Sequence, residues 1–233
     1  MYRVILVTLL CVLFSVNSVV AQTMDDSLIE FENRLDVLNQ TPITQSLRYK
    51  TDQNMFAMRV IDSNRQVVGS VEDVKFDEGG VLVSLVSEIN NVGRRTKVVE
   101  HETYQMTFHD QMNAFEIPLS LKNTPEVSAQ ALAEISPSAG GGKIIGLKGM
   151  LGAEVRSRDG RWLGEVANVV FDEKAEKVIA LVLQDVPGAS RYKKIAMPFV
   201  ARQIEVIDRF GRAEFRVERA AAIKLTEFAE QTR

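Results

Sequence analysis

One twenty-residue pattern occurs twice in this sequence, and it limits the possible folds more than any other feature. Met58–Asp77 and Ala153–Asp172 align without a gap. The shared positions are mostly apolar, and they include a glycine and a final acidic pair: Val60, Gly69, Val71, Val74, Phe76, Asp77 and Glu78 match Val155, Gly164, Val166, Val169, Phe171, Asp172 and Glu173. A repeated domain keeps its buried and turn positions because these set the fold of each unit. The sequence therefore predicts a duplication.

Within each copy the pattern indicates short strands and tight turns. Val166–Phe171 is largely apolar at both odd and even positions, as in a strand buried on both faces of a small closed barrel or sandwich. Asp159-Gly160 predicts a hairpin turn, and Asn64-Arg65 stands in its place in the first copy. Gly69 and Gly164 fall inside expected strands, where glycine commonly accompanies a bulge.

Helices are expected at the ends of these units. Asp25–Asn39 carries an apolar residue at each turn of a helix, which predicts an amphipathic helix packed on a barrel or on another chain: Leu28, Phe31, Leu35 and Leu38. Ala-rich Pro125–Ile135 and Glu218–Glu230 predict one closing helix per unit. Ser136–Gly142, with three successive glycines, is typical of a flexible linker.

The first 21 residues have the pattern of a secretory signal peptide. Arg3 precedes the apolar run Val4–Val20, and Val19-Val20-Ala21 then offers a cleavage site before Gln22. An uncleaved anchor helix is the alternative, since the run approaches the length that spans a bilayer. We therefore expect a periplasmic or secreted protein. The single cysteine, Cys11, lies in this run and outside any lipoprotein box, so the mature chain is expected to lack disulfides and thiol chemistry.

Composition is that of a globular protein, with 45% hydrophobic and 25% charged residues. The net charge of −3 argues against a nucleic-acid partner. Acidic residues outnumber basic ones in 22–142, and the reverse holds in 143–233. The two halves could attract each other or serve different partners, or the difference could be drift in surface composition.

The second half resembles the opening of the PRC-barrel family. Six segments carry the resemblance, in the family's order and spacing: Leu151–Val155, Asp159-Gly160, Leu163–Val166, Val170–Asp172, Val178–Leu183 and Ile195–Phe199. The resemblance implies a small β-barrel that serves protein contact or assembly and has no shared catalytic residues. Residues 52–135 resemble a diverged copy, in which His101-Glu102 stands where Pro198-Phe199 does.

These observations predict a mainly β fold of two tandem PRC-like barrels, each closed by a short C-terminal helix. The expected organisation is a signal peptide (1–21), an amphipathic helix and lead-in (22–50), barrel 1 (52–135), a Gly-rich linker (136–147) and barrel 2 (148–230).

Two basic loops are the first candidate binding site. Both precede the same expected strand of their copy, and their residues are Arg94, Arg95, Lys97, Arg191, Lys193 and Lys194. Together they could contact an anionic surface such as lipid headgroups or cell-wall polymer. The alternative is that lysine and arginine there keep an edge strand soluble and unpaired.

Two histidines are the second candidate. His101 and His109, flanked by acidic residues, could hold a metal ion with a carboxylate if they shared a strand face. The second copy has no counterpart, so surface-exposed histidines are the better expectation. The sequence contains no Gly-x-Ser-x-Gly motif, and the mature part contains no cysteine.

We therefore expect a non-enzymatic protein-binding or scaffolding module of the bacterial cell envelope, without a cofactor or metal. Its expected partner is another envelope protein. The alternatives are a binder of anionic lipid or cell-wall polymer through the paired basic loops and, with less support, a metal-dependent hydrolase centred on His101 and His109.

Overall fold

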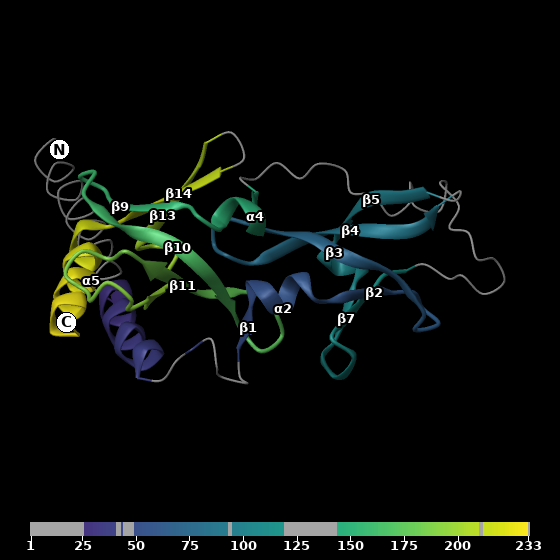
Figure 1. Cartoon of the computed structure of the whole chain (residues 1–233), viewed down its shortest axis with the longest axis horizontal. Coiled ribbons are helices and arrows are strands. Elements are labelled where there is room, and N and C mark those ends of the chain that lie inside the picture. Colours follow the sequence, from purple (N-terminus) through teal and green to yellow (C-terminus); the bar gives the residue numbers. More distant parts are fainter. Residues whose placement is uncertain are drawn as a thin grey trace, which may run out of the picture.

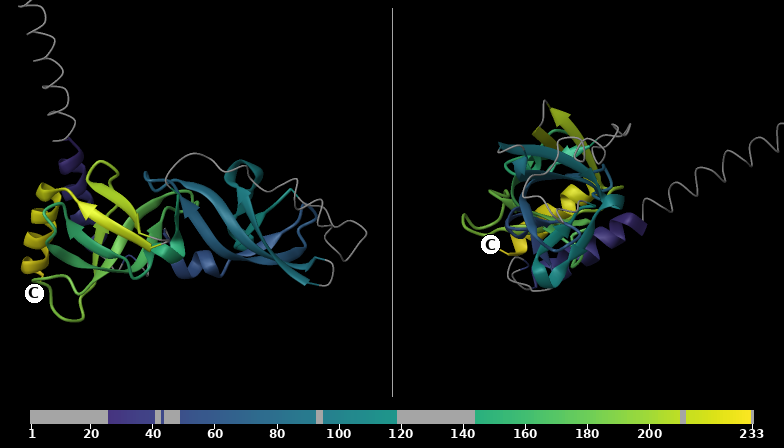
Figure 2. Two further views of the ribbon diagram at one scale, coloured as in Figure 1. Left: turned by 90° about the horizontal axis from the view of Figure 1, so that it is seen from above. Right: turned by 90° about the vertical axis from the view of Figure 1, so that its right-hand side faces the viewer.

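The computed structural model describes residues 26–40, 43, 49–92, 95–118, 144–209 and 212–232. These residues are mainly β, in two seven-stranded sheets that lie end to end along the long axis of the molecule (Figure 1). The view from above shows the same elongated arrangement (Figure 2). The signal peptide predicted for 1–21, the helix predicted for Pro125–Ile135 and the linker residues 136–143 lie outside the described residues.

The first sheet and its neighbouring segments come from residues 50–116. The elements are β1 (Lys50–Thr51), α2 (Asp52–Phe56), β2 (Arg59–Ile61), β3 (Val67–Phe76), β4 (Leu82–Val92), β5 (Arg95–Glu102), the 3-10 turn η2 (Thr103–Gln105), β6 (Thr107–His109), η3 (Asp110–Met112) and β7 (Ala114–Glu116).

The second sheet and its helix follow from residue 145. The elements are β8 (Ile145–Gly146), α4 (Leu147–Met150), β9 (Glu154–Ser157), β10 (Trp162–Phe171), β11 (Val178–Gln184), β12 (Ile195–Pro198), β13 (Ile204–Arg209), β14 (Arg212–Val217) and α5 (Arg219–Gln231).

The two sheets have the same strand order. The first runs β5-β4-β3-β2-β7-β6 and the second runs β12-β11-β10-β9-β14-β13. In each, one pair is parallel, β2 with β7 and β9 with β14, and the other pairs along this path are antiparallel. Each strand of one sheet therefore has a corresponding strand in the other.

Each sheet takes its seventh strand from the segment that leads into the other sheet. β1 precedes the first sheet but pairs with β10, with Lys50 opposite Phe171. β8 precedes the second sheet but pairs with β3, with Ile145 opposite Phe76. Because β8 and α4 include Ile145–Leu147, the last three residues of the predicted linker belong to ordered elements.

The seam between the sheets is closed by backbone hydrogen bonds and by stacked rings. The Leu82 N–H donates to the Glu176 carbonyl and the Val178 N–H donates to the Gly80 carbonyl, each at 2.8 Å. Beside them the Phe76 and Phe171 rings stack with centroids 5.2 Å apart. Buried residues of both sheets consequently form one hydrophobic core.

The leading helix, which covers residues 26–39, packs on the second sheet rather than on the first. Its apolar residues Phe31, Leu35 and Leu38 are buried, as the helical spacing predicted. In Figure 1 this helix lies beside α5, and Lys224 of α5 forms an ion pair with Glu32 of the leading helix.

This covering explains why β10 is apolar on both faces. Val169 and Phe171 join the main core, while Val170 packs with Leu38 and Ile43 in a second, smaller cluster. The prediction of a strand buried on both faces is confirmed. The second face is covered by the leading helix and the segment that follows it.

The sheets are not closed barrels, and that expectation is wrong. The end strands β12 and β13 do not pair with each other, and neither do β5 and β6. In the second half, helices cover the open sheet: α5 buries Ala221, Ala222 and Leu225, and the leading helix lies along β12. These helices bury the apolar surface of the sheet that pairing of β12 with β13 would otherwise enclose.

The predicted turns and bulges are present. Gly160 has a φ of +88° in the hairpin between β9 and β10, and Arg65 has a φ of +62° at the corresponding turn of the first sheet. The pairing register shifts next to Gly69 and next to Gly164. A Cβ on Gly69 would lie 2.1 Å from the Glu88 carbonyl oxygen, so the bulge requires glycine there.

Within the described part of the chain, no helix is long and apolar enough to cross a membrane.

Candidate functional site

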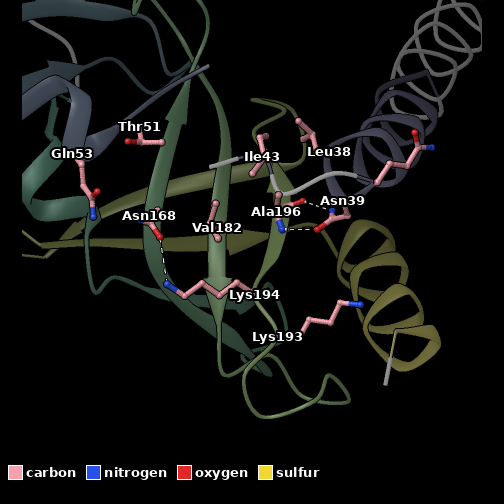
Figure 3. Close-up of a pocket in the computed structure, with 11 residues that line it drawn as sticks. Leu38, Asn39, Ile43, Thr51, Gln53, Asn168, Val182, Lys193, Lys194 and Ala196 are labelled. Atoms are coloured by element: carbon pink, nitrogen blue, oxygen red, sulfur yellow. Dashed lines mark hydrogen bonds between the residues drawn. The ribbon is translucent and has the colours of Figure 1, made fainter. Parts of the chain in front are cut away.

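A groove of about 540 Å³ opens on the second sheet, between the end of the leading helix and strands β10 to β12 (Figure 3). Eleven residues line it: Leu38, Asn39, Gln40, Ile43, Thr51, Gln53, Asn168, Val182, Lys193, Lys194 and Ala196. They come from the end of the leading helix and the segment after it, from β1 and α2, and from β10, β11, β12 and the loop before β12. The groove therefore exists only when the lead-in of the first sheet is docked on the second.

Asn39 holds one wall of the groove against the edge strand β12. Its Nδ2 donates to the Ala196 carbonyl at 2.9 Å, and its Oδ1 accepts from the Ala196 N–H at 2.8 Å. The amide thus pairs with the outward backbone groups of β12 as a neighbouring strand would. An edge strand with unpaired groups invites association with other chains, and this contact blocks part of that edge.

Asn168 links a buried carboxylate to an exposed lysine. Its Nδ2 donates to Asp52 Oδ1 at 3.3 Å, which turns the amide oxygen toward Lys194 Nζ at 3.5 Å. Asp52 Oδ1 also accepts from the Val169 N–H at 3.2 Å and is buried. The long contact to Asn168 leaves the exposed ammonium of Lys194 available to a ligand (Figure 3).

Lys193 points away from Asn168, toward the end of α5. Its Nζ donates to the Thr232 carbonyl at 3.2 Å. A lysine beside the carboxyl end of a helix is favourable because the helix dipole is negative there. Lys193 therefore adds positive charge to the rim, while Lys194 reaches along the floor.

The hydroxyl of Thr51 is already used by the backbone. It donates to Asn54 Oδ1 at 2.9 Å and accepts from the Asn54 N–H at 3.4 Å, which caps α2. The neighbouring Gln53 side chain is exposed and leaves its amide free to contact a ligand at the groove wall.

Taken together, the lining residues offer a cationic and amide rim over an apolar floor. The floor is formed by Leu38, Ile43, Val182 and Ala196, and none of the eleven lining residues is a carboxylate. Such a surface suits an extended ligand that presents carboxylates to Lys193 and Lys194 and apolar groups to the floor.

The other predicted anion contacts are not brought to this groove. Arg191 is exposed in the loop before β12, whereas Lys97 is exposed on β5 of the other sheet. Arg95 begins β5, and Arg94 lies outside the described residues. Both β4 and β11 run outward from the seam, so the start of β5 and the loop before β12 lie at opposite ends of the molecule (Figure 1).

The two histidines occupy different environments and do not form a shared site. His109 Nε2 lies 2.8 Å from Glu116 Oε2, between β6 and β7. His101 on β5 is completely buried, with Nε2 2.7 Å from Ser87 Oγ, so the expectation of an exposed side chain is wrong. Within the ranges that the structure describes, no three His, Cys, Asp or Glu side chains gather as metal ligands.

The contact between Ser87 and His101 was missed because the acidic neighbours Glu100 and Glu102 make this stretch look exposed. The alternation of Val99 and His101 with acidic residues was the available clue, since it places both on the inner face. Burial lowers the pKa of His101 to about 4, and Glu100 opposes this only in part. Both side chains of the Ser87–His101 pair are shut off from solvent, so no substrate reaches them in this state.

The groove residues from before the second sheet were also missed. Asn39 ends the leading helix, and Gln53 follows a strand of two residues, so neither belongs to a pattern that predicts a long-range contact. Only the two lysines carried a usable sequence clue.

Comparison with known families concerns the sheet that carries the groove. Residues 143–216 match the model of the PRC-barrel domain. The match to the PRC-barrel model covers β8 to β13 and most of β14, and thus includes Asn168, Val182, Lys193, Lys194 and Ala196 of the groove. No curated protein matches the chain.

Proposed function

We propose that this chain is a non-enzymatic binding module of the bacterial cell envelope, which holds an acidic, extended segment of another envelope protein. The groove on the second sheet is the proposed binding site. The observation that carries this proposal is the groove lining, which combines two lysines and four amide side chains with an apolar floor and contains no carboxylate.

A polypeptide ligand suits this lining better than a flat anionic surface does. The apolar floor would accept side chains, and the exposed amide of Gln53 would accept or donate backbone hydrogen bonds. A lipid surface would be expected to meet several cations on one face. The start of β5, near Lys97, and the loop that carries Lys193 and Lys194 instead lie at opposite ends of the long axis.

We also propose that the module consists of two copies of a PRC-barrel-like domain, with the first copy diverged. The shared strand order supports this proposal, and so does the reciprocal exchange of β1 and β8. The pairs Lys50–Phe171 and Ile145–Phe76 are equivalent under the sequence repeat. Export to the periplasm or beyond rests on the pattern of residues 1–21.

A photo-crosslinking amino acid at Gln53, in the full chain in its native envelope, tests the proposed site. Gln53 is exposed on the groove wall, so replacing it leaves the core intact. Mass spectrometry of the crosslinked product should identify one reproducible protein partner. Lys194→Glu should weaken this capture by about tenfold or more, as expected for loss of a charge contact at an interface.

Lys97→Glu is the matched control, because it makes the same charge change in the other basic loop. It should leave the Gln53 crosslink unchanged. The surface-binding alternative would be favoured instead if both variants lost the crosslink equally. It would also require salt-sensitive binding of the protein to vesicles that contain anionic lipid, weakened by either substitution. Capture that survives Lys194→Glu would rule out the groove.

A further inference from the structure

The two sheets close their common seam differently, and the difference leaves a pocket. In the second sheet, Phe199 follows β12 and is buried, with its ring edge-on to Phe215 at 6.5 Å and 87°. Its other side reaches the first sheet, where a Cβ on Gly80 would lie 2.8 Å from Phe199 Cε1. Phe199 therefore fills the seam on its side.

The corresponding position of the first sheet is Thr103, so the alignment of His101-Glu102 with Pro198-Phe199 expected from the sequence is wrong by one residue. Pro198 lies opposite Ala180 and is followed by Phe199, whereas Glu102 lies opposite Ser84 and is followed by Thr103. The ring that Phe199 contacts in the second sheet, Phe215, does have a counterpart in the first sheet.

Phe115 lies opposite Val60 as Phe215 lies opposite Val155. The first sheet thus has the ring that Phe199 would contact but replaces Phe199 itself by a threonine.

A pocket of about 260 Å³ occupies this place. Its first-sheet walls are mostly apolar and include two aromatic rings: Val81, Leu82, Thr103, Met106, Phe108 and Phe115. Phe108 and Phe115 are in tilted contact, with centroids 5.4 Å apart. From the second sheet, exposed Lys174 and Glu176 border the pocket with one charge of each sign.

We propose that this pocket binds a single aromatic ring in the position that Phe199 fills in the other half. A cavity of roughly 150 Å³ lined by apolar side chains is enough to take up benzene, so a phenyl ring fits here. Offset or edge-on contact with Phe108 and Phe115 would hold it, as aromatic pairs prefer. A polar arm on the ring would reach Lys174 or Glu176.

The ring could belong to a small molecule or to a phenylalanine of a peptide. Two probes separate these sources: benzyl alcohol, and the blocked tripeptide Ala-Phe-Ala. Binding to the full chain would be followed by equilibrium titration and by nuclear Overhauser contacts between the probe ring and a labelled Met106 methyl group. Tighter binding of the tripeptide assigns the site to a peptide, and tighter binding of benzyl alcohol assigns it to a small molecule.

Thr103→Phe supplies the ring from within the chain. It should abolish saturable binding of both probes and raise the melting temperature by a few degrees, because the added ring becomes buried. Thr96→Phe adds the same ring at an exposed position of β5 and should leave probe binding unchanged.

The Met106 contacts are measured on the unaltered chain, so the test stands even if Thr103→Phe does not fold. Absence of saturable binding at millimolar probe, or of contacts to Met106, would overturn the proposal. So would undiminished binding by a folded Thr103→Phe variant.

Discussion

Phe76 and Phe171 stack across the seam with an angle of 18° between their rings, although each is the last residue of a strand in a different sheet. Each of these residues also pairs with a strand from the segment that leads into the other sheet, Phe76 with Ile145 and Phe171 with Lys50. The centre of the molecule is thus built equally from both halves. Neither sheet has a complete core alone.

Removing one of these rings should destabilise the whole molecule. Phe171→Ala is expected to lower the free energy of unfolding by about 3–5 kcal/mol, the usual cost of emptying a buried phenylalanine site. Trp162 fluorescence reports on the second sheet, and amide exchange reports on the first. Both probes should show the same decrease in the free energy of unfolding, because the two sheets share one core. Phe228→Ala, at a partly buried position on α5, should cost less.

Unequal effects on the two sheets would contradict this expectation. A Phe171→Ala variant whose fluorescence transition moves while exchange in β3 and β4 keeps its protection would show that the sheets unfold independently.

Acid should weaken the protein through His101. Its pKa is about 4 in the folded chain, against 6.5 for a free histidine, so the unfolded chain binds the proton more tightly. Stability is therefore full above about pH 6.5 and falls as the pH drops toward 4. The total loss is on the order of 3 kcal/mol at about 1.4 kcal/mol per pH unit.

Urea unfolding between pH 7 and pH 4 measures this loss, with His101→Met as the comparison. Met197 occupies the corresponding position of the second sheet, opposite Leu181 as His101 is opposite Leu85. Ser87 keeps a contact to the Val99 carbonyl at 3.4 Å. A pH dependence as steep in His101→Met as in the parent would assign the acid sensitivity to other groups.

Both corresponding turns should be more stable with glycine than with another residue, because φ is positive at each. Gly160→Ala should destabilise the folded protein by about 1 kcal/mol through the backbone alone, since a Cβ there meets nothing within 4 Å while φ is +88°.

Arg65→Gly should stabilise the folded protein by roughly 0.5–1 kcal/mol, because relief of the left-handed φ of +62° exceeds the entropy that glycine adds to the unfolded chain. Thermal unfolding of both variants measures the signs, and a destabilised Arg65→Gly would show that the exposed side chain contributes contacts of its own.

Asn39 should stabilise the fold through the hydrogen bonds of its amide rather than through the volume of its side chain. Asn39→Ala removes both bonds to Ala196 and is expected to cost about 1–3 kcal/mol, since the partners are part-buried backbone groups. Asn39→Asp keeps an acceptor for the Ala196 N–H but sets an anion against its carbonyl. It should therefore recover little of the loss in urea unfolding. Full stability of Asn39→Asp would mean that the Nδ2 bond contributes nothing.

The sequence was most informative where a local pattern decides the structure. The leading helix followed from the spacing of Phe31, Leu35 and Leu38, and the bulges followed from Gly69 and Gly164. Both features depend on residues close together in the chain. Periodicity and glycine chemistry can therefore predict them.

Long-range pairing could not be predicted in the same way. β1 has two residues, Lys50 and Thr51, and no periodicity, yet its pairing with β10 fixes how the halves are joined. In the second sheet, helices that are distant in sequence cover the open face, and no local pattern predicts where they dock. The spacing of Leu35 and Leu38 predicts that a helix is amphipathic, but not which sheet it covers.

The docking of the leading helix also sets an order of events during synthesis. Its contacts lie far along the chain: Ser27 meets Gln203, Arg34 meets the Ile179 carbonyl, and Asn39 meets Ala196. A ribosome therefore makes this helix long before it makes the surface that receives it. This segment must wait, with its apolar face uncovered, until most of the rest of the chain has followed. A chaperone that shields residues 26–39 would have its greatest effect in that interval.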